Sequence, residues 1–327
     1  MRRILRACLP PSSSLSSYSS AAASSRSRST IVPTSKPPPV VKRPEVVMSA
    51  SVPAAASPEK VDLLILGLGW AGAYVAALLS SLHIPFAATT TSGRDSTIKF
   101  AYDPESTDAE PFRTLPATKT LLITFPIRGE PALKKFLTLY AKTHANEAAP
   151  NYILFGSTRP YTPSPQSGSV WVDRDSTPDP SIDAPRQESE AALLAHGGCV
   201  INLAGLYGGA RDPRRWVSRV APTHAALKEK GSLHLVHGKD VAQAVVAVAK
   251  AFTPGQRWLL TDMRVYDWWD LASVWGEGDE ARWALELMEE TKCRALPRHA
   301  ELLGRAVDSR AFWKQFGIVP LVPSVKL

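Results

Sequence analysis

The sequence has few cysteines and no long apolar run. Cys8, Cys199 and Cys293 are the three cysteines among 327 residues, and they form neither a CxxC pair nor an even framework. This usage is typical of a reducing compartment and excludes a cysteine-rich zinc site. No apolar stretch approaches the ~20 residues that span a bilayer, so we expect no membrane partner. We predict no metal site, because His234 and His237 lack companion carboxylates or cysteines.

Excess positive charge is confined to one segment. Residues 1–47 hold eight Lys or Arg and a single acid, Glu45, whereas the remaining residues hold 30 basic and 29 acidic side chains. We therefore expect no nucleic-acid partner for the folded part. The start MRRILRACL and the many Arg and Ser that follow are typical of a mitochondrial transit peptide; the alternative is a disordered extension without an address. Met48 offers a second start, which would give a cytoplasmic form.

A glycine-rich turn joins an apolar run to a helical pattern. Leu63–Leu66 meets Gly67-x-Gly69-x-x-Gly72, and a helix is expected over Ala71–Ser81. Gly67 permits a sharp exit from the strand, Gly69 leaves room for a phosphate, and Gly72 lets the helix pack closely. The helix start offers unpaired N–H groups to an anion. Unless the glycines form a turn by chance, the motif predicts that a dinucleotide is bound by Gly67, Gly69, Trp70, Ala71 and Gly72.

Strands and helices alternate from Val61 onward. Strands are expected at Pro85–Thr90, Thr97–Ala101, Thr120–Phe125, Asn151–Phe155, Cys199–Leu203, Leu233–Val236 and Arg257–Thr261. Helices are expected at Pro131–His144, Arg186–Ala195, Asp240–Lys250, Tyr266–Trp275 and Glu280–Glu290, and a long loop at Pro160–Pro185. This alternation predicts an α/β fold, a doubly wound parallel Rossmann sheet with a small C-terminal substrate-side lobe.

Three parts of the chain follow from this pattern. Residues 1–60 are expected to lack packed structure, because they hold few large apolar side chains. Residues 61–210 are the predicted dinucleotide-binding Rossmann core. Residues 211–327 are the predicted C-terminal substrate-side lobe, which also contributes late sheet strands.

The residues after the second strand bear on the choice of cofactor. An acid there binds the ribose hydroxyls of NAD, whereas an arginine accommodates the 2′-phosphate of NADP. The chain reads Thr91-Ser92-Gly93-Arg94-Asp95 at this point. We therefore predict NADP, with Ser92 and Arg94 at the cofactor. The alternatives are NAD, with Asp95 on the ribose, and an Arg94 that is simply solvated.

Further candidates lie at or just after the carboxyl ends of the expected strands Thr120–Phe125 and Asn151–Phe155, where ligands bind in such folds. Thr124 and Phe125 are expected at the cofactor. Ser157, Thr158 and Tyr161 are candidates for catalysis, because a hydroxyl can hold a substrate carbonyl and a tyrosine can transfer a proton. The alternative for Ser157 and Thr158 is that they cap a turn.

Other polar and aromatic residues have two interpretations each. Arg211, Arg214 and Arg215 meet an anionic substrate or a cofactor phosphate, or else lie in a solvated loop. Asp240 is expected to cap the helix after it. Tryptophans in the C-terminal third are expected to pack as core, the alternative being a pocket wall: Trp258, Trp268, Trp269, Trp275 and Trp283.

Five segments together resemble one family. They read LLILGLGWAG, YILFGSTRPYTP, WVDRDSTPDP, INLAGLYGG and LHLVHGKDVAQAV. Their order and spacing are similar to those of extended short-chain dehydrogenase/reductases of the NAD(P)-dependent epimerase/dehydratase group, especially atypical members with GxGxxG. The resemblance implies that YILFGSTRPY carries the active-site Ser or Thr. It also implies that INLAGLYGG, with Tyr207, lies near the nicotinamide, and that VHGKDVAQAV closes the substrate side.

The chain departs from that family at the catalytic pair. The family has Tyr-x-x-x-Lys on one helix face, and this region reads SIDAPRQESEAALL. With Arg186 at the lysine position, Ile182 stands at the tyrosine position. Isoleucine cannot transfer a proton; arginine can hold a ribose hydroxyl, but its pKa is too high for proton exchange. Either Tyr161 or Tyr207 supplies a phenol from another element, or catalysis is lost.

We therefore predict an NAD(P)-binding protein. The resemblance implies NADP-dependent oxidoreduction or epimerisation of a small-molecule substrate with a hydroxyl or carbonyl group. The alternative is a catalytically inactive dinucleotide-binding regulatory or scaffold protein, which Ile182 favours. The sequence leaves the oligomeric state open.

Overall fold

The computed structural model describes residues 60–325. The predicted transit peptide and the prediction that residues 1–60 lack packed structure lie outside the described residues, apart from Lys60, which is the first residue of a strand.

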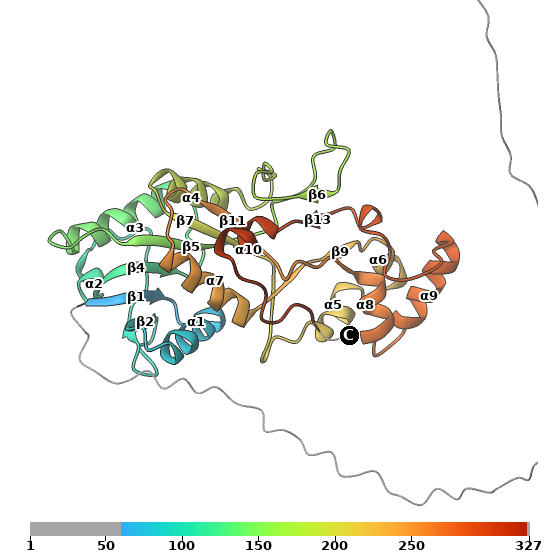
Figure 1. Cartoon of the computed structure of the whole chain (residues 1–327), viewed down its shortest axis with the longest axis horizontal. Coiled ribbons are helices and arrows are strands. Elements are labelled where there is room, and N and C mark those ends of the chain that lie inside the picture. The colour runs from blue at the N-terminus through green and yellow to red at the C-terminus, as the bar shows by residue number, and fades with distance from the viewer. Residues whose placement is uncertain (1–59, 326–327) are drawn as a thin grey trace, which may run out of the picture. The chain divides into compact units, whose positions relative to one another are not determined.

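A seven-stranded parallel sheet forms the centre of the described part (Figure 1). Its strands are β1 (Lys60–Leu66), β2 (Phe86–Thr90), β3 (Ile98–Lys99), β4 (Ala117–Ile123), β5 (Asn151–Ser157), β7 (Cys199–Leu203) and β11 (Arg257–Leu260). They lie in the order β11-β7-β5-β4-β1-β2-β3, and every neighbouring pair is parallel. The chain order reverses between β1 and β4, where ligands bind in doubly wound sheets. The predicted Rossmann fold is confirmed.

Helices cover both faces of the sheet, because successive strand side chains point to opposite sides. Leu63 and Ile65 pack on the face covered by α1 (Trp70–Ser81), α7 (Gly238–Lys250) and α10 (Arg310–Phe316). Leu64 and Leu66 pack on the face covered by α2 (Glu110–Arg113), α3 (Glu130–Thr143) and α4 (Ala184–Ala195). Burial on both faces explains the nearly continuous apolar strands. None of the helices in residues 60–325 is long and apolar enough to cross a membrane.

A second core lies in the C-terminal lobe, at the right of Figure 1. Trp268, Trp269 and Trp275 are buried there, and Trp258 is buried in the sheet core, as expected. Trp283 is half-buried. Lobe helices are α5 (Val217–Val220), α6 (His224–Lys228), α8 (Trp268–Trp275) and α9 (Glu280–Thr291). Short strands are β6 (Trp171–Val172) with β13 (Ala306–Val307), β8 (Gly205–Tyr207) with β10 (Leu235–His237), and β9 (Ser232–Leu233) with β12 (Tyr266–Asp267).

Most predicted elements begin or end a few residues away from their limits in the structure, as β4 does at Ala117–Ile123 against the predicted Thr120–Phe125, and three further differences bear on the fold. The strand Leu233–Val236 is interrupted at His234, whose Nε2 accepts the Val307 N–H at 3.0 Å. The helix Tyr266–Trp275 begins at Trp268, since Asp267 caps it by accepting the Trp269 N–H at 2.9 Å. The loop Pro160–Pro185 contains β6 and ends where α4 begins.

Asp240 does not cap α7, contrary to the prediction. His237 is the cap, with its Nδ1 accepting the Lys239 N–H at 3.1 Å. Asp240 is buried in the first turn, where it accepts two N–H groups of the segment Leu321–Val325 at 2.5 and 3.3 Å. The hydroxyl of Tyr266 accepts a third at 3.0 Å. Side chains of α7 and of the lobe therefore both bind this segment.

Candidate functional site

A cavity of about 760 Å³ opens at the carboxyl ends of the central strands. Its lining comes from the glycine turn after β1, the ends of β2, β5 and β7, the residues after β3 and β4, the start of α4, and β8 with the turn that follows it. The predicted site residues in that lining are Gly67, Gly69, Trp70, Ala71, Ser92, Arg94, Thr124, Phe125, Ser157 and Arg186. Gly72, Thr158, Tyr161 and Tyr207 do not line it.

The three glycines of the turn differ in what surrounds them. Gly67 has φ +93°, and a Cβ there would lie 2.6 Å from the Thr124 hydroxyl oxygen. A Cβ at Gly72 would lie 2.7 Å from the Gly67 carbonyl oxygen, so Gly72 serves the packing of α1 on the turn. At Gly69, apart from its two chain neighbours, no atom of the described residues lies within 4 Å of a Cβ position. The turn therefore keeps open a space in the cavity that suits a phosphate group.

Threonines of neighbouring strands hold the turn in place. Thr89 Oγ1 accepts the Gly67 N–H at 3.0 Å, and Thr124 Oγ1 donates to the Gly67 carbonyl at 2.7 Å. No side chain of the described part of the chain caps α1, and the first turn of α1 contains no acid. The start of α1 is therefore left with the unpaired N–H groups and partial positive charge that attract an anion.

The charged residues around the cavity are all arginines. Arg94, Arg186 and Arg211 line it, and no carboxylate from residues 60–325 does. Arg94 forms an ion pair with Asp95 at 2.6 Å, and its Nη2 lies 3.5 Å from the Leu68 carbonyl oxygen, beside the glycine turn. Such a lining favours an anionic ligand.

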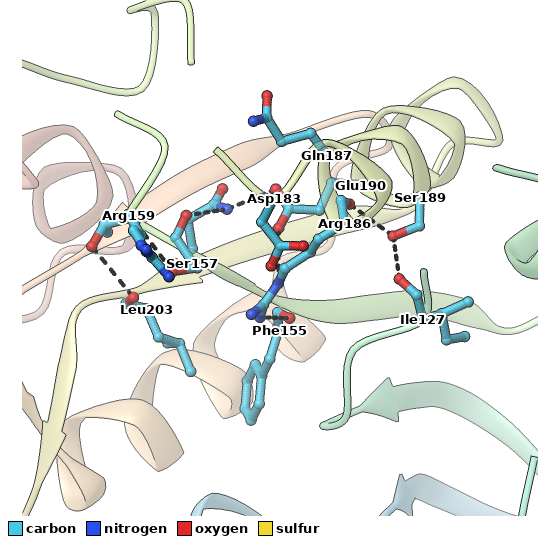
Figure 2. A network of polar contacts seen from close by, with 12 residues as sticks. Ile127, Phe155, Ser157, Arg159, Asp183, Arg186, Gln187, Ser189, Glu190 and Leu203 are labelled. Carbon is cyan, nitrogen blue, oxygen red and sulfur yellow. Dashed lines mark hydrogen bonds and ion pairs between the residues drawn. The ribbon is translucent and has the colours of Figure 1, made fainter. Parts of the chain in front are cut away.

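The start of α4 differs from the arrangement expected for a Tyr-x-x-x-Lys pair. α4 begins at Ala184, so Ile182 lies before the helix, and the two positions do not share a helix face. Asp183 between them has φ +55°. Arg186 donates from Nη2 to the Phe155 carbonyl at 2.9 Å, which holds it against the end of β5 (Figure 2).

A buried carboxylate, which sequence reasoning missed, lies behind Arg186 (Figure 2). Glu190 Oε1 lies 3.4 Å from Arg186 Nε, and its Oε2 lies 3.7 Å from Arg257 Nη2. Asn202 Nδ2 donates to Glu190 at 2.8 Å. Burial outweighs these partners and raises the pKa of Glu190. A Cβ at Gly156 would collide with Asn202 and Glu190, so a glycine in the strand makes room for the network.

The three catalytic candidates lie in different surroundings. Ser157 lines the cavity, and its Oγ accepts the Arg159 N–H at 3.2 Å, which leaves its hydroxyl proton for a ligand. Thr158 is buried, with its Oγ1 3.4 Å from the Leu203 carbonyl oxygen. Tyr161 is buried against β6, β11 and β13, and its hydroxyl meets no hydrogen-bond geometry within residues 60–325. Burial raises its pKa to about 12, although the nearby Arg257 guanidinium acts in the opposite direction.

The other tyrosines near the site do not offer a phenol to the cavity. The Tyr207 hydroxyl lies 3.4 Å from the Val322 carbonyl oxygen, and burial raises its pKa. Tyr102 lines the cavity, but its hydroxyl donates to the Ala132 carbonyl at 2.6 Å.

The two histidines considered as metal ligands are neutral side chains. Burial lowers the pKa of His234 to about 3 and that of His237 to about 4. Among residues 60–325 no group of three or more metal-ligating side chains forms a metal site.

No protein-family model and no curated protein matches the sequence. Solved structures do match. One is a candidate NAD-dependent epimerase/dehydratase from Methylobacillus flagellatus, with 17% identity, a TM-score of 0.55, and coverage of 81% of this chain and 94% of that one. RMD from Pseudomonas aeruginosa, complexed with NADPH, has 13% identity, a TM-score of 0.52, and coverage of 81% and 93%. dTDP-glucose 4,6-dehydratase from Bacillus anthracis, in complex with NAD, has 10% identity, a TM-score of 0.51, and coverage of 80% and 92%.

These likenesses show that the chain has the fold of the epimerase/dehydratase proteins. The resemblance suggested by the sequence is confirmed at the level of the fold.

Proposed function

We propose that the chain binds a nicotinamide dinucleotide in the cavity, and NADP in preference to NAD. One observation carries the proposal: the open space at Gly69 adjoins an uncapped helix start, in a cavity lined by three arginines and no carboxylate. Gly69, Trp70 and Ala71 would hold the pyrophosphate. Ser92 and Arg94 would hold the 2′-phosphate of NADP. Structural neighbours complexed with NADPH and with NAD support this class of ligand.

For the chemistry we propose oxidoreduction or epimerisation of a small hydroxyl- or carbonyl-bearing molecule. The bound nicotinamide supplies a hydride donor or acceptor. Ser157 would donate a hydrogen bond to the reacting oxygen of the substrate, and Arg186 would hold a ribose hydroxyl from the cavity wall. Glu190 acts through Arg186, because it fixes the guanidinium from behind.

A second candidate function is a dinucleotide-binding regulatory or scaffold protein. It is favoured by one observation on the tyrosines near the site. Tyr161 and Tyr207 do not line the cavity, and the Tyr102 hydroxyl is bound to a backbone carbonyl. Ile182 provides no substitute, since it has no titratable group.

The binding proposal is tested by titrating the purified full chain with NADPH and with NADH while following cofactor fluorescence. We expect NADPH to bind more tightly. Arg94→Ala should weaken NADPH binding about tenfold, the value of one charge-assisted contact, and leave NADH binding unchanged. Arg282→Ala, at an exposed arginine of α9, is the matched control. If the wild type binds neither cofactor, the proposal is wrong.

Turnover separates the two candidate functions. Aldehydes and ketones are screened for cofactor oxidation, and sugar nucleotides for epimerised product by chromatography because epimerisation leaves the cofactor unchanged overall, with wild type and Ser157→Ala. Turnover that Ser157→Ala reduces at unchanged cofactor affinity supports the enzyme. Cofactor binding with no turnover of any of these substrates supports the regulatory protein.

A further inference from the structure

A short hairpin after β8 carries one of the arginines of the cavity. Gly208 donates its N–H to the Arg211 carbonyl at 2.9 Å, and Arg211 donates its own to the Gly208 carbonyl at 3.1 Å. Gly208 and Gly209 have φ of +118° and +55°, which an L side chain rarely adopts. Two backbone hydrogen bonds thus close a tight turn that requires glycine at these positions, and the turn sets the direction in which the Arg211 side chain leaves the backbone.

Trp70 joins this hairpin to the start of α1. Its indole Nε1 donates to the Gly208 carbonyl at 3.2 Å. The guanidinium carbon of Arg211 lies 4.6 Å from the centroid of the Trp70 ring, a cation–π contact. Tyr74, one turn further along α1, packs edge-on against Trp70 with ring centroids 4.8 Å apart. Trp70 directly follows Gly69, so the guanidinium lies beside the open space of the glycine turn.

Arg211 differs from its neighbours in the basic cluster and from the other arginines of the cavity. Arg214 forms an exposed ion pair with Asp212 at 2.6 Å, and neither Arg214 nor Arg215 lines the cavity. Arg94 and Arg186 have carboxylate partners. Within residues 60–325, Arg211 has no carboxylate partner, so its charge is available to a ligand.

We propose that Arg211 binds the pyrophosphate of the dinucleotide, and that Trp70 is the positioning residue that holds Arg211 beside the start of α1. The inference rests on the proposed function and deepens it, because it names the group that each arginine recognises. A planar guanidinium can donate two parallel hydrogen bonds to phosphate oxygens. The pyrophosphate is thereby bound by the glycine turn and by the hairpin, which belongs to a distant part of the sequence.

The test compares three ligands: NADP⁺, NAD⁺ and ADP-ribose. Their affinities are measured by calorimetry for the full chain and for Arg211→Ala, Arg94→Ala and Arg214→Ala. All three ligands contain the pyrophosphate, so Arg211→Ala should weaken all of them by the same factor, about tenfold to a hundredfold. Arg94→Ala should weaken NADP⁺ alone, and Arg214→Ala should weaken none. Arg211→Ala should also flatten the salt dependence of the affinity, which a loss of fold would not do selectively.

The part played by Trp70 is tested by a double-mutant cycle. Trp70→Ala should weaken binding in the wild-type background and have much less effect in the Arg211→Ala background. Trp70→Phe keeps an aromatic face but loses the indole N–H, and we expect an intermediate affinity. Thermal unfolding of each ligand-free variant checks that it is folded. Additive effects of the two substitutions would contradict the positioning role.

Failure of the inference is distinct from failure of the proposed function. If the wild type binds none of the ligands, the proposed function is wrong. If it binds them and Arg211→Ala binds them equally well, only the assignment of Arg211 is wrong. A loss restricted to NADP⁺ would place Arg211 at the 2′-phosphate and overturn the assignment to the pyrophosphate.

Discussion

The glycine turn and the α4 wall bound the same cavity but are built in different ways. At the glycine turn, backbone atoms form the site: a helix start, an open position at Gly69, and threonines that fix the loop. At the α4 wall, Arg186 is fixed by buried side chains, chiefly Glu190. The glycine turn leaves space for a ligand, whereas the α4 wall is filled by the buried side chains that support Arg186. The glycine turn matches the GxGxxG pattern of the proteins that the chain resembles, whereas the α4 wall does not place a Tyr-x-x-x-Lys pair on one helix face.

The largest effect is expected at the α4 wall. Glu190→Ala removes the buried partner of Arg186, Arg257 and Asn202, and should lower the free energy of unfolding by about 3 kcal/mol. Both arginines are about one-fifth exposed (22% and 20%), which keeps the loss at the lower end of the range for buried pairs. Urea denaturation measures it, with Glu188→Ala on the exposed side of the same helix as control. Similar losses in the two variants would contradict a special role for the buried network.

Gly69→Val should act on binding and spare the fold. Its φ of −84° suits any residue, and the new side chain would occupy the open space. We expect dinucleotide affinity to fall at least about a hundredfold, or 2.7 kcal/mol, with an almost unchanged free energy of unfolding. Gly72→Val is the contrasting variant: its Cβ meets the Gly67 carbonyl, so it should lower the melting temperature as well. Normal affinity in Gly69→Val would show that the phosphate lies elsewhere.

The buried carboxylate also predicts a pH dependence of stability. Burial raises the pKa of Glu190, so the folded chain holds this proton more tightly than the unfolded chain does. The resulting stabilisation is complete below the unfolded pKa of about 4.3 and is lost as pH rises through the folded pKa. Relative to Glu190→Gln, the wild type should therefore lose stability as pH rises above about 4, which urea denaturation at a series of pH values measures. If the stability of the wild type relative to Glu190→Gln instead rises with pH, the charges of Arg186 and Arg257 outweigh burial in setting the pKa of Glu190.

The smallest effect is expected for a substitution at Tyr161. If Tyr161 were the missing proton donor, the same substitution would have the largest effect on turnover. Tyr161→Phe should change stability and turnover very little, because the hydroxyl lies outside the cavity lining and meets no hydrogen-bond geometry in the described part of the chain. Tyr102→Phe is the comparison, since it loses a real hydrogen bond to Ala132, worth about 1 kcal/mol. A marked loss of turnover in Tyr161→Phe would mean that Tyr161 transfers a proton, and would contradict the interpretation that the site lacks a catalytic tyrosine.

What the sequence predicted well depends on residues close together in the chain. The apolar runs at Leu63–Leu66 and Cys199–Leu203 indicate buried parallel strands because both faces must be apolar. The glycine turn is similarly local, since strand, turn and helix follow one another. Helix and strand limits were less accurate where a single polar residue decided them, as at His234 and Asp267.

What the sequence did not predict depends on distant partners. Glu190 lies in a polar stretch that suits an exposed helix, and its burial shows only when Asn202 and Gly156 are brought beside it. A polar residue in one buried strand and a glycine in another were the available signals. Arg211 and Trp70 are likewise far apart in sequence, so the spacing of the basic cluster gave no means of separating Arg211 from Arg214.

The segment Leu321–Val325 has a consequence for how the chain reaches this structure. Asp240, buried in α7, obtains backbone partners from residues that follow it by 81 and 82 positions. The Tyr266 hydroxyl donates to Asp262 at 2.6 Å and accepts the Val325 N–H of the same segment at 3.0 Å. During synthesis, the buried Asp240 carboxylate lacks these two partners, and the Tyr266 hydroxyl lacks the Val325 N–H, until the segment has left the ribosome. We therefore expect the Rossmann sheet and the lobe to complete folding together, after translation of this segment, as one cooperative unit.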